Sequence, residues 1–173
     1  MKSYFFKILV AGPGGAGKTS LLRQYIKNKF SESTKMTIGV DFFLKELQLN
    51  RDVNVSLQLW DFGGQKHFQS LHSDYVEGAK GALVLIDLTR VFEIERVKNW
   101  VDLVRMKKDD LPIVFIGNKV DLKEDIKVDD DLLQKAMEEF NMLDMLKTSA
   151  KTGENVDKAF ERIAELVYNH RDD

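Results

Sequence analysis

The sequence has no cysteine among its 173 residues and only two prolines. The lack of cysteine excludes disulfides, thiolate metal sites, cysteine catalysis and thiol-linked lipids within this chain. Long apolar runs are also lacking, because the longest, Ala82 to Ile86 and Leu111 to Ile116, have only the length of buried strands. Lys7 breaks the apolar start of the chain, unlike the apolar stretch of a secretory signal. We therefore expect a cytoplasmic protein without a lipid anchor of its own, which reaches a membrane only through partners or an anchor outside this chain.

An excess of charge of one sign is missing as well. Lys and Arg number 26 against 28 Asp and Glu, which gives a formal net charge of −2. This balance argues against a nucleic acid partner or an anionic membrane bound through bulk charge. Partners must therefore be selected by a defined site.

Apolar segments of strand length alternate with amphipathic segments along the chain. The expected strands are 5–11, 41–49, 53–60, 82–88, 113–117 and 142–147, and the expected helices are 19–30, 91–107, 130–140 and 155–168. This alternation favours a mostly parallel sheet with helices on both faces. Only Asn50, Arg51 and Asp52 separate the second strand from the third, so this pair is expected to be an antiparallel hairpin at the sheet edge. We expect residues 1–173 to form a single α/β domain.

The strongest motif follows the first expected strand, where Gly12 to Thr19 read Gly-Pro-Gly-Gly-Ala-Gly-Lys-Thr. This is the P-loop spacing, in the required context of a buried strand before it and a helix after it. The glycines let backbone N–H groups wrap round a phosphate, Lys18 neutralises the β and γ oxygens, and the Thr19 hydroxyl is a ligand for Mg²⁺. The motif predicts a nucleotide-binding loop.

A second motif, Asn118-Lys119-Val120-Asp121, follows the buried strand that ends near Ile116. Guanine presents two adjacent hydrogen-bond donors that the Asp121 carboxylate can accept, whereas adenine has no such pair. The two motifs together favour GTP over ATP. The alternative is a P-loop kinase or ATPase in which the Asn-Lys-x-Asp string is coincidental.

With these motifs, the chain resembles the Ras superfamily of small GTPases over nearly its whole length. Three further blocks resemble the Rab branch in particular: Thr37 to Phe42, Leu57 to Asp61, and Tyr75 to Gly81. A fourth block, Thr148 to Lys151, matches the last guanine-contacting loop of the superfamily. The resemblance implies a P-loop G domain with a six-stranded, mostly parallel sheet, one antiparallel edge strand and helices on both faces. It also implies GTP and GDP as ligands, with Mg²⁺.

The resemblance assigns roles to individual residues. Nucleotide contacts are implied for Gly14, Gly15, Ala16, Gly17, Lys18, Thr19, Ser20, Phe30, Thr37, Gly64, Asn118, Lys119, Asp121, Ser149, Ala150 and Lys151. Metal contacts are implied for Thr19, Thr37 and, through water, Asp61. Catalysis would rest on Lys18, on the Gly64 N–H at the γ-phosphate, and on Gln65, which would orient the attacking water.

The chain departs from the Rab pattern in its second switch segment, Asp61-Phe62-Gly63-Gly64-Gln65-Lys66, whose double glycine resembles Arf proteins. Lys66 replaces the usual acidic residue, which puts the standard mode of nucleotide exchange in doubt. No arginine lies between Phe30 and Thr37, where G-protein α subunits carry one that accelerates hydrolysis. We therefore expect slow intrinsic hydrolysis, an external activating protein and an exchange factor.

Partner binding is expected at Phe42, Trp60 and Tyr75, which occupy the positions of the aromatic triad that effectors of Rab proteins contact. Plain packing of strand aromatics is the competing interpretation. The sequence as a whole predicts a GTP-hydrolysing molecular switch in membrane traffic or signalling. The alternative function is a GTP-dependent interaction module with negligible hydrolysis.

Overall fold

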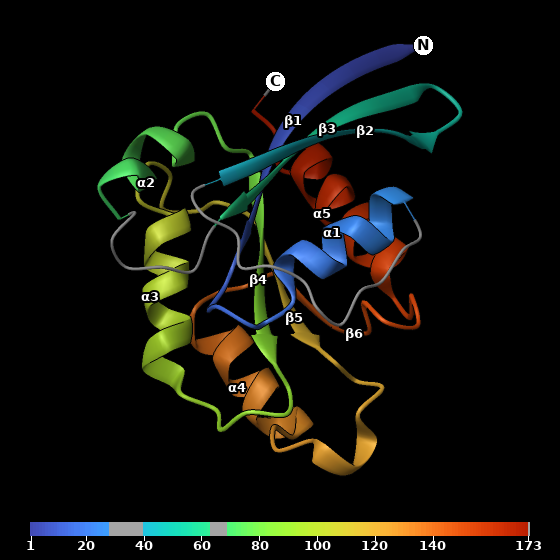
Figure 1. Ribbon diagram of the computed structural model, residues 1–173. Helices are drawn as coiled ribbons and strands as arrows, with labels where there is room; N and C mark the ends of the chain where they lie inside the picture. Colours follow the sequence, from blue (N-terminus) through green and yellow to red (C-terminus); the bar gives the residue numbers. More distant parts are fainter. Residues whose placement is uncertain (28–39, 63–68, 173) are drawn as a thin grey trace.

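A six-stranded sheet forms the centre of the molecule, and helices cover both of its faces (Figure 1). The computed structural model describes residues 1–27, 40–62 and 69–172. The strands are β1 (Lys2–Ala11), β2 (Val40–Asn50), β3 (Val53–Phe62), β4 (Gly81–Asp87), β5 (Ile113–Asn118) and β6 (Asp144–Thr148). The helices are α1 (Lys18–Lys27), α2 (Gln69–Val76), α3 (Ile94–Val104), α4 (Asp130–Glu139) and α5 (Val156–Asn169), with a short 3-10 turn η2 (Lys123–Asp125).

The strands lie in the order β2-β3-β1-β4-β5-β6, so the first strand of the chain is central. Among the described strands, only β2 and β3 pair in antiparallel fashion, and all other neighbours are parallel. The predicted hairpin at the sheet edge is confirmed. Its turn is stabilised by the Asn50 side chain, whose Oδ1 accepts a 2.9 Å hydrogen bond from the backbone N–H of Asp52.

Each face of the sheet has its own hydrophobic core. On one face α1 and α5 pack against β1, β3, β4 and β5, and Tyr25 of α1 stacks on Phe160 of α5 with ring centroids 4.0 Å apart. On the other face α2, α3 and α4 cover β4 and β5. Figure 1 shows these two groups of helices on opposite sides of the strands. Strands covered on both sides must be apolar throughout, which explains why every residue of β4 and β5 is buried.

Arg105 closes the loop that follows α3. Its guanidinium donates to the carbonyl of Phe140 at 2.5 Å, to that of Asn141 at 3.0 Å, and twice to that of Leu111 at 3.2 Å. One side chain therefore joins the C-terminal end of α3, the start of the segment leading into β5, and the loop after α4.

The predicted ends of some elements are wrong by a few residues. The predicted helix 91–107 is observed as Ile94–Val104, and Val91 lies outside it with 74% of its surface exposed. Its apolar character suggested a helical position, although it belongs to the preceding loop. The helix predicted over 19–30 begins at Lys18, and its stretch beyond residue 27 lies outside the described residues. Asp129 caps α4 by accepting a 2.9 Å hydrogen bond from the N–H of Leu132.

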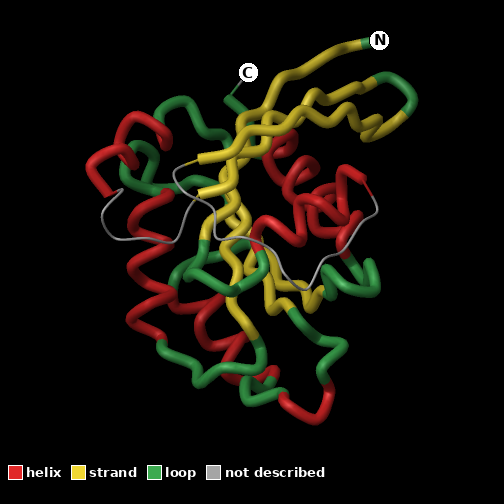
Figure 2. The backbone as a smooth tube through the Cα atoms, viewed as in Figure 1, coloured by secondary structure: helices red, strands yellow, loops and turns green. Residues whose placement is uncertain are grey.

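The parallel strands bring the motifs together, because the carboxyl ends of parallel strands lie at one edge of the sheet. At this edge Asp61 is near the end of β3, Gly12 follows β1, Asp87 ends β4, Asn118 ends β5 and Thr148 ends β6. The loops beyond β1, β4 and β5 gather at this end in Figure 2. No helix in the described ranges is long and apolar enough to cross a membrane.

Candidate functional site

The glycine-rich loop between β1 and α1 has a backbone that needs glycine. Gly12, Gly15 and Gly17 have φ values of 150°, 81° and 97°. A Cβ added to Gly17 would stand 2.3 Å from the side-chain nitrogen of Asn118, and one added to Gly12 would stand 2.3 Å from the carbonyl oxygen of Leu85. The loop is therefore held close to its neighbours in a conformation that can wrap round a ligand. We call residues 12–17 of this loop the cradle.

Lys18 begins α1 and carries a buried ammonium group, with only 6% of the residue exposed. The Nζ donates to the carbonyl oxygens of Gly12 at 2.7 Å and Pro13 at 3.0 Å. Burial lowers the pKa of Lys18 to about 8, and the Asp61 carboxylate partly opposes that shift. An incompletely solvated cation inside a glycine cradle suits an anionic ligand such as a phosphate.

Thr19 and Asp61 meet beside Lys18. The Thr19 hydroxyl donates a 2.5 Å hydrogen bond to Oδ2 of Asp61, which is fully buried near the end of β3. A hydroxyl oxygen and a carboxylate oxygen side by side are the hard donors that Mg²⁺ prefers. These two residues therefore fit a Mg²⁺ ion bound next to the phosphate cradle.

Asn118 connects the second motif to the first. Its Nδ2 donates a 2.9 Å hydrogen bond to the carbonyl of Ala16, and its Oδ1 accepts one of 2.9 Å from the Thr148 hydroxyl. Asn118 and Thr148 are almost completely buried. The side chain of Asn118 thus ties together the loops that follow β1, β5 and β6.

Asp121 is held by the loop that follows β6. The Ser149 hydroxyl donates a 2.7 Å hydrogen bond to Oδ1 of Asp121, and Oγ of Ser149 accepts a 3.0 Å bond from the N–H of Thr152. Ala150 is buried directly after Ser149, and Lys151 is exposed beyond it. A carboxylate fixed in this way can accept two hydrogen bonds from a planar base such as guanine.

Lys119 is part of the same motif but turns toward β4. It has a φ of 70°, and its Nζ lies 2.9 Å from Oδ2 of Asp87. Burial opposes ionisation of Asp87, but hydrogen bonds from Thr89 and Lys119 outweigh it and lower the pKa of this carboxyl. Nε of Arg90 also lies 3.4 Å from Oδ2 of Asp87. No local motif in the sequence marks Asp87 or Arg90 as site residues, because only the placement of β4 beside β1 brings them to the site.

Other predicted site residues are distributed as follows. Gly14, Gly15, Ala16 and Gly17 lie in the cradle, and Ser20 lies in the first turn of α1. Phe30, Thr37, Gly64 and Gln65 lie outside the described residues, as does Lys66.

The aromatic residues Phe42, Trp60 and Tyr75 lie together, as the resemblance to the Rab triad implies. The rings of Phe42 and Trp60 have centroids 5.6 Å apart, and those of Trp60 and Tyr75 are 5.3 Å apart. Nζ of Lys7 lies 4.1 Å from the centre of the Trp60 ring. Phe42 is 47% exposed, whereas Trp60 and Tyr75 pack partly against the core, so the group has one exposed end and one packed end.

Comparison with known proteins agrees with this geometry. The family model described as Ras family matches residues 7–169. The chain belongs to the Ras family. It is 36% identical to Ras-related protein Rab-11C of Dictyostelium discoideum, over 96% of this chain and 74% of that protein. It is 37% identical to Ypt/Rab-type GTPase YPT7 of Saccharomyces cerevisiae, over 94% of this chain and 81% of that protein.

This Ras-family chain is therefore a Rab-like small GTPase: a molecular switch that binds guanine nucleotide and hydrolyses GTP. A third relative, Ras-related protein RABA5e of Arabidopsis thaliana, is 38% identical over 98% of this chain and 77% of that protein. Ras-family GTPases generally act with effectors, activating proteins and exchange factors. The resemblance predicted from the motifs is confirmed.

Proposed function

We propose that the site at the carboxyl edge of the sheet binds GTP and GDP with Mg²⁺ and that the nucleotide state controls binding of effector proteins. The observation that carries this proposal is the hydrogen bond from Asn118 to Ala16, because it joins the guanine-selecting motif to the phosphate cradle. When bound, Mg²⁺ supplies positive charge at the β- and γ-phosphates. Thr19 and Asp61 would hold it, together with Thr37 from outside the described residues.

Three residues of the chain would have separate roles in hydrolysis. Lys18 neutralises phosphate charge from within the cradle, Gly64 offers a backbone N–H to the γ-phosphate, and Gln65 orients the attacking water for in-line displacement. No arginine occurs between residues 30 and 37 to stabilise the transition state, so we expect slow intrinsic turnover and an activating protein in the cell.

A competition assay tests the base preference. Bound GDP should be displaced by GTP and not by ATP, and Asp121→Asn should shift the preference from guanine to xanthine nucleotides, because the amide now donates where the carboxylate accepted. Asp125→Asn, which changes an exposed carboxyl group in η2, is the matched control and should leave the preference unchanged. Equal displacement by ATP would overturn the guanine assignment.

Single-turnover hydrolysis tests the role of Gln65. Gln65→Leu should slow hydrolysis by about tenfold or more while nucleotide binding stays intact, because the water loses its orienting group. Gln48→Leu, on the exposed face of β2, is the matched control. If the unchanged chain binds GTP and turns it over no faster than Gln65→Leu, the protein is an interaction module and not an active hydrolase.

Tryptophan emission tests whether the aromatic surface follows the nucleotide. The chain has two tryptophans, so Trp100→Phe leaves Trp60 as the only emitter. The emission should differ between the GDP form and the form with a non-hydrolysable GTP analogue, since Trp60 contacts both Phe42 and Tyr75. Identical spectra would argue against an effector surface at this triad. The Rab and Ypt names of the relatives favour membrane traffic as the process that such effectors serve.

A further inference from the structure

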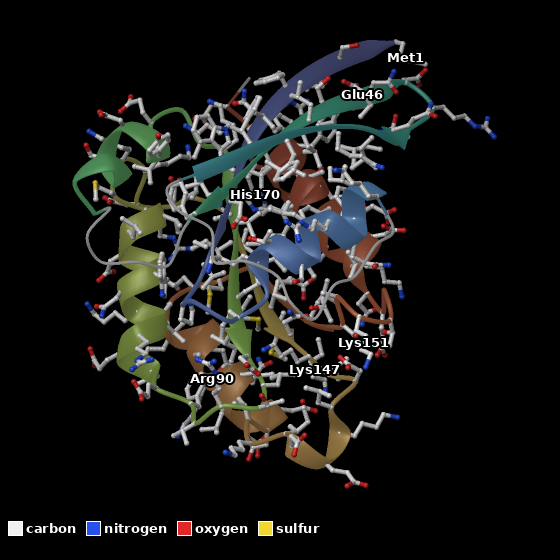
Figure 3. All side chains as sticks on the ribbon, viewed as in Figure 1. Met1, Glu46, Arg90, Lys147, Lys151 and His170 are labelled. Carbon is white, nitrogen blue, oxygen red and sulfur yellow. The ribbon has the colours of Figure 1, made fainter. Side chains whose placement is uncertain are left out.

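We propose that Arg90 is a nucleotide-binding residue, which contacts the part of the polyphosphate shared by GDP and GTP and slows nucleotide release. This inference rests on the nucleotide site proposed above and adds to it a second cation besides Lys18. Figure 3 labels Arg90 in the lower half of the view, below the blue loop between β1 and α1.

The guanidinium of Arg90 lies against the phosphate cradle. A Cβ built on Gly15 would stand 2.9 Å from Nη2 of Arg90, so the glycine leaves the space that the guanidinium needs. Arg90 also lines a cavity together with Pro13 and Gly14 of the same loop. Arg90 is therefore a neighbour of the cradle although it follows a different strand.

Two groups of donors on Arg90 have different roles. Nε faces Oδ2 of Asp87 at 3.4 Å. Among the described residues, Nη1 and Nη2 donate no hydrogen bond to protein, and the side chain is 63% exposed. A planar guanidinium with terminal donors still available matches phosphate oxygens well.

Asp87 does not need Arg90 for its own neutralisation. Its Oδ1 accepts the N–H and the hydroxyl of Thr89 at 2.8 and 2.6 Å, and its Oδ2 is already 2.9 Å from Nζ of Lys119. A contact of 3.4 Å from a largely exposed arginine adds little to stability. Thr89 and Lys119 therefore satisfy the Asp87 carboxylate, and the charge of Arg90 can serve another anion beside the cradle.

The order of the strands indicates which part of the nucleotide Arg90 meets. Along the carboxyl edge, Asp61 comes from β3, the cradle from β1, Arg90 from the loop after β4, and Asn118 from β5. The metal and the γ-phosphate belong at the β3 end of this series, and the base belongs at the β5 and β6 end. Arg90 thus lies between them, beside the α- and β-phosphates, which both nucleotides carry.

Dissociation of unmodified tritium-labelled GDP and of a tritiated non-hydrolysable GTP analogue, each chased with unlabelled nucleotide, tests this proposal. Arg90→Ala should raise both dissociation rates by a similar factor, roughly tenfold, because a charge-assisted hydrogen bond is lost from each complex. Arg90→Lys should recover part of the effect, since it keeps the charge but not the planar fork.

Arg96→Ala is the matched control. Arg96 lines the same cavity and is 65% exposed, but its Nε is paired with Glu93 at 2.5 Å. Unchanged dissociation in Arg90→Ala would overturn the proposal, and so would an effect confined to the GTP form or to hydrolysis, which would place Arg90 at the γ-phosphate. If the unchanged protein retains no labelled nucleotide, the nucleotide site itself is wrong and the inference falls with it.

Discussion

Asn118 donates a 2.9 Å hydrogen bond to the carbonyl of Ala16 across 102 residues of sequence. The same side chain accepts from Thr148, so three loops depend on one buried amide. Asn118→Ala should lower the free energy of unfolding by about 1–3 kcal/mol, because buried partners are left unsatisfied. It should also speed nucleotide release.

Urea unfolding and nucleotide dissociation measure the two effects of Asn118→Ala. Asn99→Ala, on an exposed position of α3, should change stability by less than about 0.5 kcal/mol. Native affinity in Asn118→Ala would show that the two motifs are positioned independently of this side chain.

Gly17 and Gly14 should respond differently to alanine. At Gly17 the φ is 97° and the new Cβ would collide with Asn118, whereas at Gly14 a new Cβ meets nothing within 4 Å. Gly17→Ala should therefore abolish nucleotide co-purification, and Gly14→Ala should preserve it. Chromatography of the nucleotide released from each purified variant gives the comparison, and equal nucleotide content in both would contradict the cradle geometry.

Arg105 should matter for stability and not for the site. Arg105→Ala removes donors from the carbonyls of Leu111, Phe140 and Asn141, and should cost about 1–3 kcal/mol in urea unfolding. Arg105→Lys should recover only part of this loss, because an ammonium cannot reproduce the fork. Nucleotide affinity should stay the same in both variants, and a large loss of affinity would show that the loop is coupled to the site.

Tyr25 should make the protein sensitive to alkali. Burial, with the nearby charges of Asp157 and Glu161, raises its pKa above the usual value of 10.0. Above pH 10 the unfolded state loses the phenol proton that the folded state keeps. The contribution of Tyr25 to the free energy of unfolding is therefore complete below pH 10, and it falls by about 1.4 kcal/mol per pH unit above that value.

Comparison with Tyr25→Phe isolates the effect of the phenol. That variant retains the stacked ring on Phe160 but has no proton to lose, and its free energy of unfolding should fall less steeply between pH 10 and 11. Parallel pH profiles for the two proteins would assign the alkaline sensitivity to other groups.

The strands and the two nucleotide motifs could be predicted because their signals are local. Buried parallel strands are apolar throughout, as in β4 and β5, and the glycine loop has a fixed spacing before Lys18. Helix ends were less predictable, since exposed Val91 has the same apolar character as a buried helical residue.

Arg90 could not be predicted from sequence in this way. Its proximity to Gly15 arises only because β4 pairs with β1, a relation between segments distant in the chain. Asp87 likewise appears in sequence as an ordinary acidic residue after a strand. Its two basic neighbours, Lys119 and Arg90, become visible only when β4 and β5 end at the same edge.

The central position of β1 has a consequence for how the protein is made. Its neighbours are β3 and β4, which both follow it in the sequence, so β1 has no complete set of partners until residue 84 has been synthesised. Before that point, the chain can form the β2–β3 hairpin but cannot close the sheet. The phosphate cradle follows the end of β1. Because the sheet around β1 is still incomplete early in synthesis, the cradle cannot yet hold a nucleotide. Ligand binding is a late event in the biogenesis of this protein, available only to chains in which the sheet has closed.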